Sequence, residues 1–574
     1  MRVVDYVIDQ VYRAGAKHVF TITGGGAMFL NDAVAAHPLI EPVCNHHEQA
    51  SAMAAVAYSK YTGKPSLVCP TTGCGGTNTI TGLLDAWQDS VPVVFVSGNV
   101  NLHQISPPGV RNLGVQEARI VDIVKPITKY AKLIESVDEV EETVTEALRL
   151  CTEGRPGPVW IDIPMDIQGK EMDVFDFEKE ILKAKRPLIL AGGGVATSMP
   201  RDDFRDFVAG MKIPVVTTFN AVDLITDDDP YFVGRVGVKG TRAGNFAMQN
   251  CDFLLVLGFR LAVPATGYNY KTFARDAKVV VVDIDREEHS KGTVKIDHFI
   301  QSDVKDFVKK VGYPSVAFWH QQLEGSDEWQ QKCVEWKKKW PVIQPYRSDE
   351  DGIDLYDFMG RLNKHNPDGS VVISDAGSAY YVGCQATHIK GKDRFITSSA
   401  QAEMGFTVPA CIGAAFAGAE CVVGITGDGS LQMNIQELQT IAHHQLPIKL
   451  FVWNNEGYLS IRTTQKKFFE GREIGTDDES GVSFPHLYDV TNAYGLDYLG
   501  VHNYATLDSA MDVIFNTDGP MVIEIMCQKW QEVVPTLQGR KNADGTISAP
   551  PLEDMYPFLP REEFYDNMIV EPVE

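Results

Sequence analysis

The sequence predicts an α/β protein of three doubly wound parallel-sheet domains followed by an irregular tail. Three observations lead to this fold class. Short apolar runs of strand length alternate with stretches of helical periodicity, the pattern of a parallel sheet with helices on both faces. The alternation stops and restarts twice, and each round has the length of one domain. The two interruptions are charged and lack strand patterning.

The three rounds define the expected domains, which are residues 1–168, 183–340 and 352–530, with the tail at 531–574. Strands of the first round are expected at residues 18–22, 66–69, 91–96 and 158–163, and helices at 48–60 and 137–151. Strands of the second round are expected at residues 187–195, 214–219, 252–258 and 278–284.

The joins between the rounds are expected to be linkers, at residues 169–185 and 321–351, the second with a helix at 327–340. The proline-rich tail could either close over a site or wrap the surface. Because most irregular termini are surface segments, we expect the wrap.

Composition excludes several classes of function. A formal net charge of −24 over 574 residues argues against binding to nucleic acids or anionic membranes. The ten cysteines form no C-x-x-C pair, several lie in apolar runs, and we expect them to be reduced. No apolar run approaches membrane-spanning length, and the start lacks the order of a signal peptide. The sequence therefore predicts a cytoplasmic protein.

The third domain is organised around residues 422–457. Two apolar runs, at residues 422–426 and 448–453, flank a stretch of helical periodicity in which Asn434 and Glu437 have capping-box spacing. A right-handed crossover would lay the two strands parallel and bring Asp428 and Asn455 to the same carboxyl edge. This is the edge at which open α/β sheets bind ligands.

The residue types at this edge point to a metal and a phosphate. A carboxylate, an amide oxygen and free carbonyls suit a hard divalent cation such as Mg²⁺. The turn through Gly429 and Ser430 can offer backbone N–H groups to phosphates that share the cation. The arrangement resembles the diphosphate and magnesium motif of thiamine-diphosphate (ThDP) enzymes. An ordinary turn followed by an ordinary loop is the alternative.

Further motifs resemble the acetolactate-synthase-like family of ThDP enzymes over nearly the whole chain. They are HEQ at residues 47–49 (H-E-x in the family), GGGA at 24–27 (P-G-G-A), TTGCGGTN at 71–78 (T-S-G-P-G-A-T-N), VQE at 115–117 (F-Q-E) and DAGS at 375–378. The resemblance implies that the active site lies between the first domain of one subunit and the third domain of another. A homo-oligomer, dimer or dimer of dimers, is therefore expected.

The resemblance assigns roles to single residues. Glu48 would hydrogen-bond the aminopyrimidine ring and activate the cofactor, from a dry, apolar environment that raises its proton affinity. By itself, Glu48 would be a first-turn helix acid. Gln116 and Gly26 would orient substrate, and Met404 would be an apolar wedge between the two cofactor rings. Asp428, Asn455 and the carbonyl of Gly457 would bind the metal. The remaining expected ThDP contacts are Asn78, Gly377, Ser378, Ala402, Gly429 and Ser430.

The second domain carries glycine turns and acids typical of a dinucleotide-type sheet. The stretch GRVGVKGT at residues 234–241 resembles the family's flavin-side G-M-L-G-M-H-G-T, with Lys239 in place of histidine. Flavin adenine dinucleotide (FAD) is the expected ligand, although many relatives keep this domain empty or bind another nucleotide. The expected FAD contacts are Gly193, Gly194, Arg260, Asp285 and Asp303.

The sequence therefore predicts a ThDP- and Mg²⁺-dependent lyase/carboligase that decarboxylates pyruvate or a similar 2-oxo acid and passes the acyl unit to a carbonyl acceptor. Thr464 and Glu403 depart from the family pattern on the substrate side, which favours another acceptor, by analogy a keto sugar nucleotide. The alternatives are an FAD-dependent oxidase, a simple 2-oxo acid decarboxylase and a catalytically silent cofactor-binding protein. Glu48 argues against the last.

Overall fold

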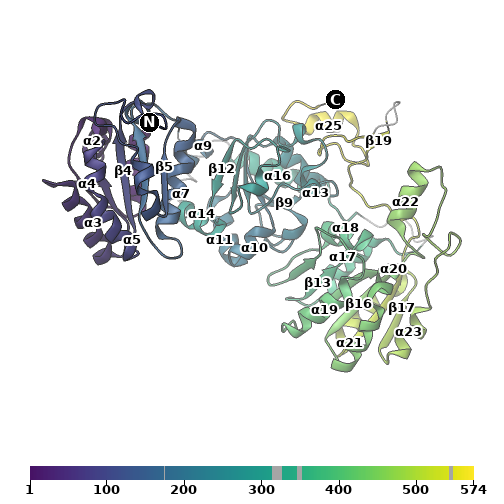
Figure 1. The fold of residues 1–574 in the computed structure, drawn as a ribbon. Helices are drawn as coiled ribbons and strands as arrows, with labels where there is room; N and C mark the ends of the chain where they lie inside the picture. Colours follow the sequence, from purple (N-terminus) through teal and green to yellow (C-terminus); the bar gives the residue numbers. More distant parts are fainter. Residues whose placement is uncertain (174, 313–325, 345–351, 542–546, 574) are drawn as a thin grey trace. The chain divides into compact units, whose positions relative to one another are not determined.

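The computed structural model describes residues 1–173, 175–312, 326–344, 352–541 and 547–573 (Figure 1). The chain divides into two compact units, Met1–Asp176 and Phe177–Glu574. Parts of the expected linker at 321–351 and of the tail lie outside the described residues. The described residues form three six-stranded parallel sheets and one small hairpin, which confirms the predicted fold class.

The first unit contains one sheet in the order β2-β1-β3-β4-β6-β5. Its strands are β1 (His18–Thr21), β2 (Glu41–Cys44), β3 (Ser66–Cys69), β4 (Val93–Asn99), β5 (Tyr130–Leu133) and β6 (Val159–Pro164). Its helices are α1 (Val3–Arg13), α2 (Met28–Ala36), α3 (Glu48–Thr62), α4 (Cys74–Asn78), α5 (Ile80–Gln88), α6 (Ile120–Val124), α7 (Val140–Thr152) and α8 (Met165–Gln168).

Alternate residues of the central strands face two different cores, as a parallel sheet covered on both faces requires. Val93 and Phe95 of β4 pack in a cluster with α3 and α5, whereas Val94 and Val96 pack with α1, α2 and α7. Figure 1 shows the helices in layers on the two sides of this sheet. Their small residues, such as Ala52 on α3, allow close packing on the strands.

The second unit begins with a sheet in the order β12-β11-β10-β7-β8-β9. Its strands are β7 (Pro187–Ala191), β8 (Val215–Thr217), β9 (Phe232–Arg235), β10 (Phe253–Leu257), β11 (Lys278–Asp283) and β12 (His298–Gln301). Its helices are α9 (Phe177–Ile181), α10 (Gly193–Ser198), α11 (Arg201–Met211), α12 (Arg242–Asn250), α13 (Val263–Thr266), α14 (Val304–Gly312) and α16 (Ser326–Lys339).

Two segments expected as linkers contribute to the core of this second sheet. Phe177 of α9 is buried and contacts Phe253 and Phe307 edge to face. Trp329 and Trp336 of α16 are buried, and the Trp329 indole N–H donates to the carbonyl of Pro187 at 2.9 Å. Their aromatic side chains, rather than the charged residues between them, decide where these helices lie.

The third sheet has the order β14-β13-β15-β16-β18-β17. Its strands are β13 (Val371–Ser374), β14 (Arg394–Thr397), β15 (Val422–Gly427), β16 (Ile448–Asn454), β17 (Asp497–Val501) and β18 (Met521–Met526). Its helices are α17 (Leu355–His365), α18 (Gly377–Ala386), α19 (Thr407–Phe416), α20 (Asp428–Leu431), α21 (Leu438–His444), α22 (Leu459–Phe468), α23 (Leu487–Ala493) and α24 (Tyr504–Asn516).

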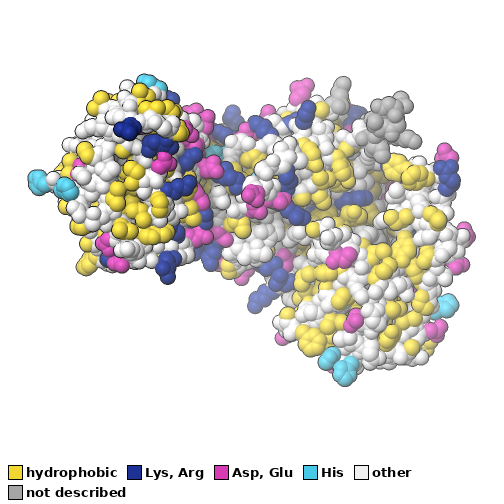
Figure 2. Space-filling model, viewed as in Figure 1, with side chains coloured by type: hydrophobic (Ala, Val, Ile, Leu, Met, Phe, Trp, Pro, Cys, Tyr) yellow, Lys and Arg dark blue, Asp and Glu magenta, His cyan; other side chains and the backbone are white. Residues whose placement is uncertain are grey.

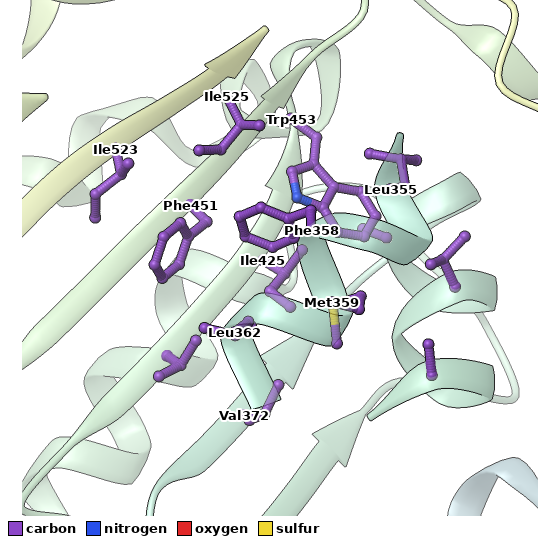
Figure 3. Close-up of a cluster of buried hydrophobic side chains, with 14 of the residues drawn as sticks. Leu355, Phe358, Met359, Leu362, Val372, Ile425, Phe451, Trp453, Ile523 and Ile525 are labelled. Atoms are coloured by element: carbon purple, nitrogen blue, oxygen red, sulfur yellow. The ribbon is translucent and has the colours of Figure 1, made fainter. Parts of the chain in front are cut away.

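Large side chains fix helix α17 on one face of the third sheet. Phe358 contacts Phe451 and Trp453 of β16 edge to face, and Figure 3 shows Met359 and Leu362 of the same helix turned toward the strands. The opposite face packs against α19 and α21. The buried core therefore holds β15 and β16 side by side, and the register pairs Gly427 with Trp453 at their carboxyl ends.

Described residues of the C-terminal tail lie against the second sheet's layer. The tail carries the hairpin β19 (Arg540–Lys541) and β20 (Ile547–Ser548) and the helix α25 (Arg561–Asn567). Its fully buried Glu553 pairs with Arg275 at 2.8 Å and accepts from Gln249 at 2.7 Å. Because a buried ion pair with a second hydrogen bond is costly to break, the tail is a fixed part of this layer rather than a lid.

Two further expectations concern cysteines and membranes. All ten cysteines are unpaired, and seven of them are buried, which agrees with reduced core residues. In the part of the chain that the structure describes, no helix is both long and apolar enough to span a bilayer.

Candidate functional site

The carboxyl ends of β15 and β16 bring Asp428 and Asn455 together, as predicted. Asp428 is buried in the first turn of α20, and its carboxylate accepts from the backbone N–H groups of Gly429 at 2.7 Å and Gly457 at 2.9 Å. Burial nevertheless raises the pKa of Asp428 to about 6. The carboxylate is thus oriented by the turn, and no lysine or arginine in the described part of the chain forms a salt bridge with it.

The second strand end supplies the other oxygen ligands expected of a metal site. Asn455 is 5% exposed, and its Oδ1 has no hydrogen-bond partner among the described residues. Gly457 has a φ of +135°, and a Cβ there would lie 1.9 Å from the carbonyl oxygen of Thr476, so only glycine fits. A buried amide oxygen without a donor, beside a buried carboxylate, fits a hard divalent cation such as Mg²⁺.

Arg462 hydrogen-bonds the backbone of the turn at residues 455–457. Its role was not predicted from the sequence. The side chain is 0% exposed, and its guanidinium donates to the carbonyls of Asn455 at 3.0 Å, Glu456 at 3.2 Å and Lys529 at 2.7 Å. It also lies 3.5 Å from the carboxylate of Asp477. One arginine therefore ties the metal-side turn to the ends of two other segments.

The buried acid Asp375 connects the turn that contains Asp428 to the turn that contains Met404 and Gly405. Asp375, at the end of β13, accepts from the hydroxyls of Thr426 at 2.8 Å and Ser430 at 2.7 Å, and burial raises its pKa. The Ser430 hydroxyl in turn accepts from the backbone N–H of Gly405 at 2.8 Å. The buried carboxylate thus reaches Gly405 through one hydroxyl.

The helix expected after residue 431 is interrupted, and its predicted capping box is wrong. Asn434 has non-helical angles (φ −136°, ψ 33°), and residues Gln432–Glu437 form a 3₁₀ segment before α21. The Asn434 amide donates to the carbonyl of Gly405 at 2.9 Å. Tertiary bonding of the side chain has replaced local capping, so Gly405 is held at both its N–H and its carbonyl.

The other residues expected to contact ThDP surround this edge. Met404 is 42% exposed, as a side chain available to a ligand must be, and Ala402 has a φ of +47°. Gly377 (φ +63°) and Ser378 form the first turn of α18, which follows β13. The first turn of α20 contains Gly429 and Ser430. The structure therefore brings these residues together at the carboxyl edge of one sheet, beside two helix N-termini.

In the first unit, Glu48 begins α3 directly after β2. Its carboxylate accepts from the Asn78 amide at 3.0 Å, and both side chains are half-buried. The expectation of a dry environment is not met by this unit alone, because the unit leaves one side of Glu48 open. Two expected cofactor contacts are nevertheless joined directly.

The two expected substrate-orienting residues lie in neighbouring loops of the same edge. The carbonyl of Gly26 accepts from Gln168 at 2.7 Å, and a Cβ on Gly26 would lie 1.7 Å from the hydroxyl of Thr72. Gln116 is exposed with a φ of +60°. Glu117 fixes its loop by accepting from the N–H groups of Ser106 at 2.7 Å and Leu113 at 3.0 Å.

A second buried acid lies beneath this edge. Asp162 of β6 is 2% exposed and accepts from Ser97 at 2.5 Å and from the Asn99 amide at 2.7 Å. Burial raises the pKa of Asp162 to about 6. The Asn99 amide also reaches the carbonyl of Ala118 at 3.4 Å, two residues after Gln116. The acid therefore supports the loop that carries an expected substrate contact.

The expected FAD contacts divide into two groups. Gly193, Gly194 and Arg260 line a cavity of about 350 Å³ at the carboxyl edge of the second sheet. Asp303 instead accepts from the backbone N–H of Lys305, and Asp285 accepts from that of Glu288. Asp303 also accepts from the hydroxyl of Ser198 on α10. Neither acid is among the residues that line the cavity.

The cavity itself has features that fit part of a dinucleotide. A Cβ on Gly194 would lie 2.7 Å from the carbonyl of Gly258, so glycine is required there. The Thr218 hydroxyl lines the cavity, is buried, and has no partner in the described part of the chain. Tyr380, hydrogen-bonded to Ser399 at 2.8 Å, lines the side contributed by the third sheet's layer.

The supporting contacts of five residues were not predicted from the sequence. Arg462, Asn434 and Glu117 bond backbone groups of other segments or turns. Asp375 and Asp162 accept from side chains that lie more than 50 residues away in the chain. A partial signal existed for Asp375, which follows a buried strand within the DAGS motif. Glu117 lies in the VQE motif and Asn434 in a capping-box spacing, although neither pattern predicted the contact observed. Arg462 and Asp162 had no local pattern that could have identified them.

Comparison with known proteins agrees with this geometry. Three family models match the chain: the N-terminal TPP-binding domain of thiamine pyrophosphate enzymes at residues 1–123, the central domain at 177–311 and the C-terminal TPP-binding domain at 375–525. The chain is 32% identical to the acetolactate synthase isozyme 2 large subunit of Escherichia coli (strain K12), over 94% of this chain and 98% of that protein. It is 30% identical to the acetolactate synthase large subunit of Pyropia yezoensis, over 94% of each chain.

Proposed function

Because the chain belongs to the thiamine pyrophosphate enzyme family, as a ThDP-dependent, acetolactate synthase-like decarboxylase/carboligase, we propose that it uses Mg²⁺, takes pyruvate or a similar 2-oxo acid as donor, and transfers the acyl unit to a carbonyl acceptor. The observation that carries the proposal is the unpartnered Asn455 Oδ1 beside the buried Asp428 carboxylate. We propose Asp428, Asn455 and the Gly457 carbonyl as the metal ligands.

We assign separate roles to the chain's own residues. Bound ThDP supplies an electron sink that stabilises the carbanion left by decarboxylation. Glu48 would hold a proton at its carboxyl group next to the cofactor's pyrimidine ring, and the Asn78 amide orients that carboxyl group. Gln116 and Gly26 orient the 2-oxo acid, and Met404 sets the shape of the space beside them.

We further propose that the enzyme is a cytoplasmic homo-oligomer, dimer or dimer of dimers, with Glu48 from one chain and Asp428 from another at each site. Exposed apolar side chains on α3 and α5, namely Met53, Leu84 and Trp87, support an interface on the first unit. Figure 2 shows apolar side chains gathered on the visible face of the third sheet's layer as well. Such surfaces are typical of subunit contacts.

Mixing two inactive variants tests the shared site. Glu48→Gln and Asp428→Asn chains should each be inactive, whereas their co-refolded mixture should regain turnover, because a mixed dimer contains one intact site. Sedimentation of the wild-type chain gives the oligomeric state. A fully active monomer, or no recovery from a mixture shown to contain mixed dimers, would contradict the proposal.

FAD binding in the cavity beside Gly193, Gly194 and Arg260 is proposed on the lining described above, and it also supports a second candidate function. An FAD-dependent oxidase would pass electrons from the donor to flavin. Pyruvate-dependent bleaching of bound FAD with oxygen uptake would favour the oxidase, whereas unchanged flavin absorbance during product formation favours the carboligase.

The acceptor is proposed to be a carbonyl compound other than the 2-oxo acids of branched-chain synthesis, such as a keto sugar nucleotide. Thr464 lies exposed on α22, where the family pattern has tryptophan. Mass spectrometry of products from labelled pyruvate and a panel of acceptors tests this. A labelled carboligation product supports the proposal, and release of free aldehyde alone would show a simple decarboxylase.

A further inference from the structure

The side-chain hydroxyl of Ser430 is already occupied within the protein. Its O–H donates to the Asp375 carboxylate at 2.7 Å, and its oxygen accepts from the backbone N–H of Gly405 at 2.8 Å. A serine hydroxyl has a single proton to donate. Because the charged oxygens of a diphosphate are acceptors, this hydroxyl is not free to bind them. Ser430 can therefore meet the diphosphate only through its backbone N–H.

The bond between Ser430 and Asp375 is closed to solvent. Ser430 is 6% exposed and Asp375 is 0% exposed. The carboxylate also accepts from the Thr426 hydroxyl at 2.8 Å and from the backbone N–H of Ala376 at 2.7 Å. A buried group that loses such a partner keeps the full cost of its desolvation. The orientation of the Ser430 hydroxyl toward Gly405 is therefore fixed by the acid.

The backbone beside Met404 is held from two directions. Besides the bond from its N–H to Ser430, Gly405 accepts from the Asn434 amide at 2.9 Å through its carbonyl. Gly405 has a φ of +84°, and a Cβ there would lie 2.6 Å from the Cβ of Met433, so glycine is required. Met404 itself is 42% exposed. The turn thus fixes the backbone of Met404 and leaves its side chain available to a ligand.

The same acid borders the residues proposed to hold the diphosphate. Ala376, whose N–H bonds to Asp375, directly precedes Gly377 and Ser378 at the start of α18. One carboxylate therefore connects this start of α18 with the first turn of α20 and, through one hydroxyl, with the turn beside Met404. Such a connection fixes the distance between the diphosphate contacts and the side chain expected between the cofactor rings.

We propose that Asp375 and the Ser430 hydroxyl are positioning residues for Met404, and that the Ser430 side chain makes no contact with the diphosphate. This inference rests on the role of Met404 in the proposed function. A loosened Met404 would leave the reacting ring less well placed, and small misplacements cost turnover steeply. The charge-assisted contacts to the diphosphate and the metal would remain. Turnover and cofactor affinity should therefore respond differently to the loss of this hydroxyl.

Two variants that each remove one donor from the same carboxylate oxygen test the proposal. Ser430→Ala removes the donor that continues to Gly405, whereas Thr426→Val removes a donor that ends in β15. In the cofactor-free chain, Ser430→Ala should speed amide hydrogen exchange at Gly405 by at least roughly tenfold, because that N–H loses its acceptor. Thr426→Val is the matched control and should leave this exchange unchanged.

The holoenzyme, saturated with ThDP and Mg²⁺, should separate turnover from affinity. Ser430→Ala should lower kcat by at least roughly tenfold, while the Kd of ThDP, measured by calorimetry, changes by less than roughly threefold. Ser430→Thr keeps the hydroxyl and should restore most of kcat. Asn434→Ala removes the other bond to Gly405 without touching Asp375, and it should repeat the loss of kcat even if Ser430→Ala is too unstable to purify.

Two results would overturn the inference. A roughly tenfold weaker affinity for ThDP with unchanged kcat in Ser430→Ala would make the hydroxyl a diphosphate contact. Exchange at Gly405 that is unchanged in Ser430→Ala, or equally fast in Thr426→Val, would show that the hydroxyl does not hold the turn. The exchange measurement needs no cofactor, so its result is independent of the proposed reaction. Wild-type release of labelled CO₂ from pyruvate reports on the proposed reaction alone.

Discussion

The edges of the first and third sheets present their functional side chains in opposite ways. At the third edge, Asp428 is buried and held by two backbone N–H groups, and Arg462 fixes the turn behind it. At the first edge, Glu48 accepts a side-chain hydrogen bond from the Asn78 amide and is half-buried. The difference teaches that the chain by itself fixes the geometry of the turn around Asp428, whereas it leaves the Glu48 carboxyl group partly accessible.

The two edges nevertheless share one supporting device. Each has a buried acid one layer below the functional loops, Asp162 in the first sheet and Asp375 in the third. Each acid accepts from side-chain donors that continue to a loop carrying an expected ligand contact. A buried carboxylate accepts several hydrogen bonds at once, so it can hold several strand ends in register.

The largest effect on turnover is expected from a change of Glu48, at the carboxyl edge of the first sheet. Glu48→Gln should lower turnover by at least roughly 100-fold, because the amide cannot exchange the proton that general acid–base catalysis requires. ThDP affinity, measured by calorimetry, should change little, because the diphosphate is held by the other edge. Glu41→Gln, at an exposed acid of β2, is the control. Turnover that survives Glu48→Gln would refute the assigned role.

A change at the carboxyl edge of the third sheet should weaken metal binding rather than proton transfer. Asp428→Asn should weaken Mn²⁺ binding in the presence of ThDP by roughly 10- to 100-fold, measured by electron paramagnetic resonance. The same change should raise the free energy of unfolding of the metal-free chain, since it removes a buried charge whose pKa is already raised. Asp497→Asn, at an exposed position of β17, should do neither. Weaker metal binding with lower stability would indicate a structural role.

Arg462 is a difference between the two edges. Among the described residues of the first edge, no buried arginine holds a functional loop in this way. Arg462→Met should cost about 1–3 kcal/mol of unfolding free energy by leaving buried carbonyls without donors, and should weaken Mn²⁺ binding by roughly tenfold through a looser turn. Arg462→Lys should recover part of the stability but little of the metal affinity, since lysine cannot serve three carbonyls in one plane. Equal metal affinity in all three proteins would show that the turn holds itself.

The smallest effect is expected from the acid beneath the first edge. The pKa of Asp162 is about 6 in the folded chain against an ordinary value of 3.8, so the unfolded chain binds fewer protons between these values. Stability from this group is therefore greatest at low pH and falls as pH rises through about 6, by about 1 kcal/mol between pH 5 and pH 7.5. Asp162→Asn should flatten this dependence. Urea midpoints at pH 5 and pH 7.5 measure it, and an unchanged slope would contradict the prediction.

The sequence by itself determined the fold class and the pairing of Asp428 with Asn455. Apolar runs specify buried parallel strands through periodicity alone, and the ends of adjacent parallel strands must meet at one edge. Motifs with fixed spacing, at residues 47–49 and 71–78, predicted Glu48 and Asn78 as cofactor contacts. In the structure the Asn78 amide donates to the Glu48 carboxylate.

Only the tertiary structure decided which side chains support these positions. Asn434 bonds Gly405 instead of capping a helix, Asp285 accepts from its own turn, and Arg462 joins the carbonyls of Asn455 and Glu456 to that of Lys529. Such choices depend on which donors and acceptors become buried together, and burial is a property of the packed chain rather than of local sequence. Periodicity fixes where a strand ends, whereas packing decides what each polar group there can bind.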